Sequence, residues 1–164
     1  QRQMCIRDRT PEGQLDLGRT GLLCKAAEGA GLTLHRAIDV SRDPLQTWQD
    51  AAQLGIDTVL TSGAAASCLK GQETIGQLLD LHGKHGGPEI LIGAGVNADG
   101  SRGMRKTFPQ AVAFPMSGKI EVESRMLFRR SDVPMGLPGL DEWHIQQTSE
   151  SAVRAARKAL DAIP

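Results

Sequence analysis

Short apolar runs alternate with longer segments of helical periodicity along most of this chain of 164 residues. The runs lie at 31–38, 56–61, 89–93 and 111–114. Short runs of this kind are typical of parallel strands that are covered on both faces. Strands that alternate with helices form βα units around a parallel sheet. The pattern therefore predicts an α/β fold with about four parallel strands.

The segments around these runs carry the start signals of helices. Ser41 or Asp43 before Pro44 is a typical helix start, and Asn97 can cap another helix. We expect helices at 15–28, 43–54, within 67–85, at 97–107 and from 148 or 149 to 163. The stretch 115–147 lacks a clear period and offers only Met126–Phe128 as an extended piece. Such a long loop is uncommon in a compact domain unless it is functional.

The first nine residues, QRQMCIRDR, have neither helical nor strand periodicity. The run resembles a translated transposase adaptor from sequencing-library preparation, and the alternative is a natural polar tail. We expect residues 1–9 to be an adaptor-derived artefact and the domain to comprise residues 10–164, so Cys5 is assigned no function.

Composition excludes several classes of partner. Lys plus Arg and Asp plus Glu both number 19, and 3% of residues are aromatic. This balance gives no attraction to nucleic acid or to an anionic membrane and no surface for stacking bases. No apolar run reaches the roughly 18 residues that a membrane helix needs. The three cysteines Cys5, Cys24 and Cys68 are far apart, which favours a reducing, cytoplasmic location and gives no metal site by spacing.

Polar residues follow the first predicted strand, where parallel α/β folds bind ligands. His35, Arg36 and Asp39 supply a titratable base, a fixed cation and a carboxylate within five residues. We take these three as candidate catalytic residues. Strand alternation puts His35 and Arg36 on opposite faces, so the alternative is a structural Arg–Asp pair beside an unrelated histidine.

Hydroxyl groups and glycines follow the later strands and could bind an anion. Glycines let backbone N–H groups approach a ligand, and a helix that starts at Asn97 adds a favourable dipole. The alternative is tight-turn geometry alone. The candidate anion-binding residues are Thr61, Ser62, Gly63, Gly93, Gly95 and Ser117.

Five segments of the chain match the sequence motifs of one known protein family, in the same order. The segment TLHRAID at 33–39 resembles the family's THRAFD, and LGIDTVLTSG at 54–63 resembles its LGxxRVLTSG. The segment IGAGV at 92–96 resembles its AGAGV. SRMLFRR at 124–130 and VPMG at 133–136 resemble SxMxYRN and VxMG. The chain thus resembles the CutC copper homeostasis family, and the resemblance covers nearly everything after Thr10.

The resemblance implies the C-terminal half of a (β/α)8 TIM-type barrel, with the four strands as its fifth to eighth. It also implies copper as a ligand, a cytoplasmic location and a homo-oligomeric full-length parent. The proposed copper cysteines belong to the family's early strands. The family usually has a histidine where this chain has Pro115, which can neither donate a proton nor ligate a metal.

Two functions follow. The first is a cytoplasmic protein of copper binding and copper homeostasis, for which Cys24, Cys68 and His35 are the soft or imidazole ligands on offer. The second is a barrel enzyme that acts on a small anionic metabolite. In it His35 would be the general acid or base, Arg36 would bind the anion and Asp39 would orient either.

Overall fold

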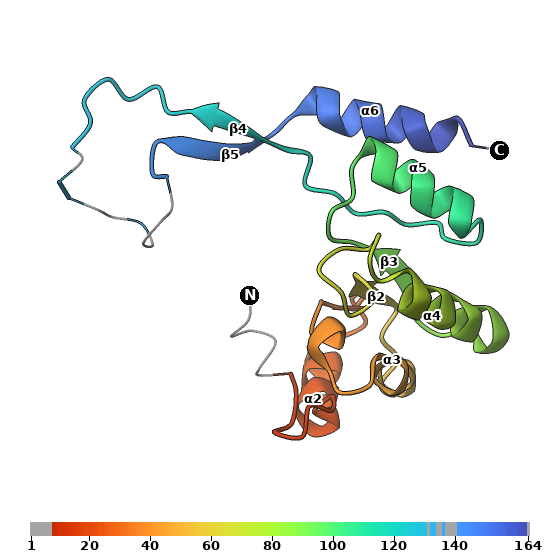
Figure 1. Ribbon diagram of the computed structural model, residues 1–164. Helices are drawn as coiled ribbons and strands as arrows, with labels where there is room; N and C mark the ends of the chain where they lie inside the picture. Colours follow the sequence, from red (N-terminus) through yellow and green to blue (C-terminus); the bar gives the residue numbers. More distant parts are fainter. Residues whose placement is uncertain (1–7, 131, 134–135, 137–140, 164) are drawn as a thin grey trace.

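The computed structural model describes residues 8–130, 132–133, 136 and 141–163. Its regular elements are ordered along the chain in two groups (Figure 1). The first group surrounds a parallel sheet and the second contains an antiparallel strand pair. The elements are α2 (Leu17–Ala26), β1 (Thr33–Leu34), the 3-10 helix η1 (Ile38–Val40), α3 (Pro44–Gln53), β2 (Thr58–Thr61), α4 (Gln72–His85), β3 (Glu89–Ile92), α5 (Ala98–Thr107), β4 (Lys119–Glu123), β5 (His144–Thr148) and α6 (Glu150–Asp161).

The parallel sheet has the strand order β1–β2–β3. Leu34 pairs with Val59, and Val59 pairs with Ile90, so the three strands are in register at their centres. This confirms the predicted α/β class with parallel strands. The described residues form no closed barrel.

The predicted fourth strand at 111–114 is reduced to a single bridge between Leu91 and Ala113. Ile92 N donates to Ala113 O over 2.9 Å. The next rung of this parallel ladder would require an N–H at position 115. Pro115 has none, so the pairing stops after one bridge.

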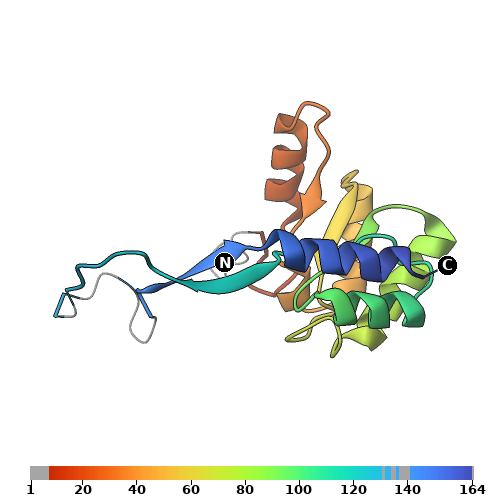
Figure 2. The same cartoon turned by 90° about the horizontal axis from the view of Figure 1, so that it is seen from above.

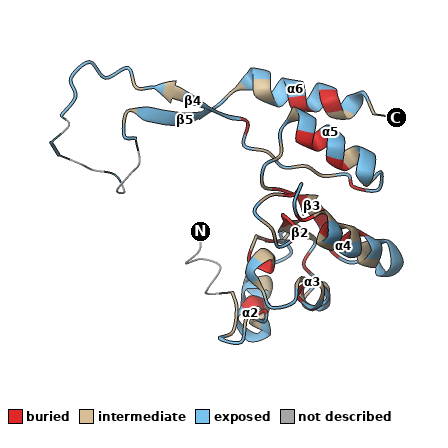
Figure 3. Cartoon of the chain, viewed as in Figure 1, coloured by how far each residue is buried: buried red, intermediate tan, exposed pale blue. Residues whose placement is uncertain are grey.

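One face of the sheet is buried beneath helices and the other is not. Val59, Ile90 and Ile92 are completely or almost completely buried, and they pack in one core with residues of α3 and α4 such as Trp48 and Leu78. The alternate residues Thr58, Leu60, Glu89 and Leu91 are only half-buried. Figure 3 shows buried stretches at β2 and β3 and on the helices beside them. Strand geometry places these two sets on opposite faces. The sheet therefore has one covered face and one open face.

The cap residues confirm three predicted helix starts. Asp43 accepts from the N–H groups of Leu45 and Gln46 at the start of α3, and Asn97 accepts from Gly100 N. Ser149 accepts from Ala152 N at the start of α6. The predicted first strand is wrong in length: only two residues of 31–38 pair, because the chain turns into η1 after Arg36.

The stretch 115–147 contains structure that the periodicity did not predict. β4 and β5 pair in antiparallel fashion, with Glu121 opposite Gln146. Both strands project away from the rest of the molecule in two perpendicular views (Figures 1 and 2), while α5 and α6 pack together at their base. The predicted extended piece at 126–128 is not part of a strand. Within the described residues, no helix has the length and apolarity that crossing a membrane requires.

Candidate functional site

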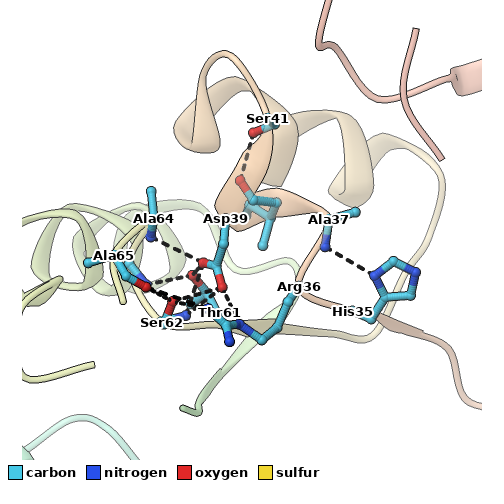
Figure 4. Close-up of polar contacts among 11 residues, drawn as sticks. His35, Arg36, Ala37, Asp39, Ser41, Thr61, Ser62, Ala64 and Ala65 are labelled. Carbon is cyan, nitrogen blue, oxygen red and sulfur yellow. Dashed lines mark hydrogen bonds and ion pairs between the residues drawn. The ribbon is translucent and has the colours of Figure 1, made fainter. Parts of the chain in front are cut away.

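The carboxylate of Asp39 is the centre of the polar cluster beyond β1 and β2 (Figure 4). Its side chain is 4% exposed and belongs to η1. Oδ1 accepts from Thr61 Oγ1 over 2.5 Å and from Ala64 N over 3.1 Å. Ser62 donates from its backbone N, which lies 3.0 Å from both oxygens, and its hydroxyl oxygen lies 2.9 Å from Oδ2. The strand end of β2 thus binds an anion that the chain itself supplies.

Arg36 completes the cluster from the end of β1. Its Nε donates to Asp39 Oδ2 over 2.6 Å, and its Nη2 donates to Ser62 Oγ over 2.6 Å. A longer contact of 3.5 Å joins Nη2 to Ala65 O. Its Nη1 has no hydrogen-bond partner among the described residues. The side chain as a whole is 39% exposed, so Arg36 lies at the edge of the cluster next to solvent.

His35 lies apart from this cluster, as Figure 4 shows. Ala37 N donates to His35 Nδ1 over 3.0 Å. That bond leaves the proton of a neutral ring on Nε2, which lies 2.7 Å from Asp8 Oδ2. The structure therefore brings Arg36 and Asp39 together and directs His35 elsewhere, as strand alternation indicates.

Several donors in the predicted anion site are already in use. The hydroxyl of Thr61 and the amide of Ser62 bind Asp39. Gly63 N donates to Thr61 Oγ1 over 2.8 Å, and Gly93 N donates to Thr61 O over 2.8 Å. Gly95 follows β3, and Ser117 follows the bridged segment at 111–114 and is exposed. Arg36 is the cationic group in the cluster, and its Nη1 has no hydrogen-bond partner among the described residues.

Close backbone packing holds the β2 loop in place. Gly63 has a φ of +74°, and a Cβ there would lie 2.1 Å from Gly71 O. A Cβ at Gly71 would lie 2.0 Å from Ser62 O. No side chain fits between these backbones, so both positions require glycine. This contact fixes the amides that bind Asp39.

The sequence did not identify Ala64 and Ala65 as part of the cluster. Ala64 has a φ of +56°, which turns its N–H toward Asp39. Ala65 O lies 2.7 Å from the hydroxyl oxygen of Ser62, and the single proton of that hydroxyl can be donated to Ala65 O or to Asp39 Oδ2. Alanine carries no side-chain chemistry, and no periodicity marks a left-handed backbone position. Only the folded backbone reveals their role.

The thiols do not form a metal site in the described part of the chain. Cys68 is completely buried, and burial raises the pKa of its thiol. Cys24 lies on α2 and is half-buried. Among the residues that the structure describes, no three His, Cys, Asp or Glu side chains are placed to hold a metal ion. Cys5 lies outside the described residues.

Comparison with known proteins identifies the family. The model of the CutC family matches residues 2–108. This chain belongs to the CutC family. The match confirms the resemblance that the five motifs indicated, and it covers the whole of β1, β2 and β3 and the polar cluster at their ends.

Curated CutC relatives are longer than this chain. The family protein CutC of Chromobacterium violaceum is 37% identical over 152 residues, which cover 93% of this chain and 60% of the relative. The family protein CutC of Pasteurella multocida is 34% identical, with 93% and 61% covered. The chain thus spans about three fifths of the length of these relatives.

A crystal structure from Streptococcus agalactiae shares the fold. It is described as that of a candidate copper homeostasis protein CutC. Its TM-score to this chain is 0.58 at 22% identity, with 65% of this chain and 51% of that chain covered. At this identity the likeness concerns the fold alone.

Proposed function

We propose that the cluster at the end of β1 and β2 binds a small anionic metabolite through Arg36. The observation that carries this proposal is the guanidinium itself. Two of its nitrogens are held by Asp39 and Ser62, while Nη1 has no hydrogen-bond partner among the described residues. A guanidinium fixed in this way is preorganised to bind a carboxylate or a phosphate.

The proposed site belongs to half of a (β/α)8 TIM-type barrel. The open face of the sheet supports this, because barrel strands direct alternate residues inward. Here the inward set would be Thr33, Thr58, Leu60, Glu89 and Leu91. The polar cluster then lies at the carboxyl ends of the strands, where barrel enzymes bind their substrates. A cytoplasmic location and a homo-oligomeric full-length parent are part of the same proposal.

The enzymatic version of this proposal uses His35 as general acid or base. The contacts of His35 set a condition on that role, because Ala37 N donates to Nδ1 and Asp8 Oδ2 lies 2.7 Å from Nε2, although without the geometry of a hydrogen bond. Proton transfer to a ligand at Arg36 would require His35 to leave Asp8. We therefore expect binding to depend on Arg36, and any turnover to depend on both residues.

A titration with inorganic phosphate and with citrate tests the binding site. We expect both ligands to raise the melting temperature, since saturation at 100 times Kd stabilises a protein by about 2.7 kcal/mol. Arg36→Met should abolish the shift and Arg42→Met, which removes an exposed arginine elsewhere, should retain it. His35→Ala should also retain it. Equal shifts in the two arginine variants would refute the proposed site.

Copper is the second candidate, and the description of the Streptococcus agalactiae relative favours it. Cu(I) prefers thiolate and thioether ligands. The described residues do not fit such a site, because Cys68 is buried with a raised pKa and lies on a different segment from Cys24. Titration with Cu(I) against a competing chelator tests this candidate. Stoichiometric binding that Cys24→Ser and Cys68→Ser abolish would establish copper as a ligand of this chain.

A further inference from the structure

The loops after β2 and β3 have the same backbone conformation at equivalent positions. The two strands pair as far as Thr61 and Ile92. In both loops, the second and third residues after these positions have a positive φ. They are Gly63 (+74°) and Ala64 (+56°) after β2, and Ala94 (+67°) and Gly95 (+80°) after β3. Alanine rarely adopts this conformation, so its occurrence in both loops indicates a shared backbone structure.

In the loop after β2, this conformation binds a carboxylate. The N–H of Ala64 donates to Asp39 Oδ1 over 3.1 Å, and the N–H of Ser62 lies 3.0 Å from both carboxylate oxygens. Successive backbone N–H groups in such turns form a concave site for an anion. The chain therefore contains one example of this loop with an anion bound, and that anion is one of its own side chains.

In the loop after β3, the equivalent N–H has no such partner. Gly95 is exposed, and its N–H has no hydrogen-bond acceptor among the described residues. The direction of this N–H is fixed, because Cys68 N donates over 3.0 Å to Ala94 O, which belongs to the same planar peptide unit. A Cβ on Gly95 would lie 3.3 Å from the Cβ of Ser67, whose hydroxyl also has no hydrogen-bond partner in the described part of the chain. Two hydrogen-bond donors without acceptors thus lie in one loop.

We infer that the ligand of this site carries two anionic groups, of which Arg36 binds one and the donors of Gly95 and Ser67 bind the other. This inference rests on the proposed function and names the class of its ligand. Arg36 reaches the end of β2, where its Nη2 donates to Ser62 Oγ. Neighbouring strands lie about 4.8 Å apart, so the two anionic groups are within about 10 Å of each other. That separation suits a small metabolite with a phosphate or a carboxylate at each end.

Alkane bisphosphonates of increasing chain length test this inference, and methylphosphonate is the matched ligand with one anionic group. We expect one chain length to bind at least about tenfold more tightly than methylphosphonate, because its second contact is intramolecular. Ser67→Ala should weaken bisphosphonate binding about tenfold, the scale of one hydrogen bond to a charged group, and should leave methylphosphonate binding unchanged. Ser151→Ala, which removes an exposed hydroxyl on α6, is the control and should change neither affinity.

NMR of the backbone amides locates the second anionic group. The N–H signal of Gly95 should shift saturably with the bisphosphonate that binds most tightly. Gly29 is the matched control, because it is an exposed glycine with a φ of +86° whose N–H also lacks an acceptor among the described residues. Its signal should not shift. Asp99→Asn removes a like charge from the first turn of α5 and should strengthen bisphosphonate binding.

Three results would overturn this inference. These are bisphosphonates that at every length bind no more tightly than methylphosphonate, equal shifts of Gly95 and Gly29, and an unchanged bisphosphonate affinity in Ser67→Ala. In each case methylphosphonate binding that Arg36→Met abolishes would still support the proposed function. Methylphosphonate binding that survives Arg36→Met would refute the proposed function instead, and no binding of any of these ligands would refute both.

Discussion

Replacing Asp39 tests whether its carboxylate organises the cluster between β1 and β2. The side chain is 4% exposed and accepts from Arg36, Thr61, Ser62 and Ala64. Asp39→Ala leaves these donors without their acceptor. Breaking a buried ion pair by removing one partner costs about 3–5 kcal/mol. Arg36 is 39% exposed and can be rehydrated, so we expect a loss of about 3 kcal/mol, near the lower end of that range.

Urea denaturation followed by tryptophan fluorescence measures this loss. Trp48 is buried and donates to Pro88 O over 3.0 Å, so its emission reports on the core next to the sheet. Trp143→Phe removes the second tryptophan, which lies beside β5. Arg36→Ala is the comparison variant, because Asp39 keeps its other donors there. We expect about 1–2 kcal/mol from Arg36→Ala. A cost below about 1 kcal/mol for Asp39→Ala would refute the role of the carboxylate.

Three further predictions concern other parts of the molecule. Gly63→Ala should destabilise the fold by about 2–4 kcal/mol in urea denaturation, because the added Cβ clashes with the backbone of Gly71 at a left-handed position. Gly29→Ala is the control, because its Cβ meets nothing within 4 Å, and it should cost only about 1 kcal/mol. Equal costs would contradict the packing of Gly63 against Gly71. Cys68 should resist alkylation in the native chain because it is completely buried, while Cys24 should react in minutes with the same reagent. Mass spectrometry of the two cysteine peptides measures both rates, and faster alkylation of Cys68 than of Cys24 would contradict this prediction. The pKa of His144 is raised, first by its hydrogen bond to Asp141 and also by the charge of that carboxylate, so its NMR titration midpoint should lie above 6.5 and fall in Asp141→Asn. The stabilisation from this pair is then fully present below pH 6.5 and is lost as the pH rises through the raised value; an unchanged midpoint in the variant would contradict the pairing.

Local signals predicted the helix starts well. Asp43, Asn97 and Ser149 each bind backbone N–H groups two or three residues ahead, so the cap and its partners lie within one short segment. The apolar runs likewise predicted β2 and β3, because both strands are buried on alternate residues by their neighbours. Each of these signals lies within one short segment of the sequence, so it can be recognised without knowing how distant segments pair.

The missed features depend on long-range pairing or on single backbone positions. The predicted fourth strand forms only one bridge, because Pro115 has no N–H to make the next hydrogen bond of the ladder. Alternation was visible in Ile120 and Val122, but β5 lies 20 residues beyond β4, and nothing local links the two. The sequence predicts that Asp39 orients His35 or Arg36, and the Asp39 carboxylate accepts a hydrogen bond from Arg36. Its amide partners in the β2 loop lie 23 to 25 residues away and emerge only from the fold.

The binding role of Arg36 is tested most directly by NMR of the arginine side chains during a phosphate titration. We expect the Arg36 guanidinium signals to shift saturably, while the exposed arginines Arg42 and Arg102 shift little. Asp39→Asn, which loosens the hold on the guanidinium, should weaken the affinity. Shifts of the same size at all three arginines, or no shift at Arg36 at any phosphate concentration, would contradict the proposal that this residue binds an anion at the strand ends.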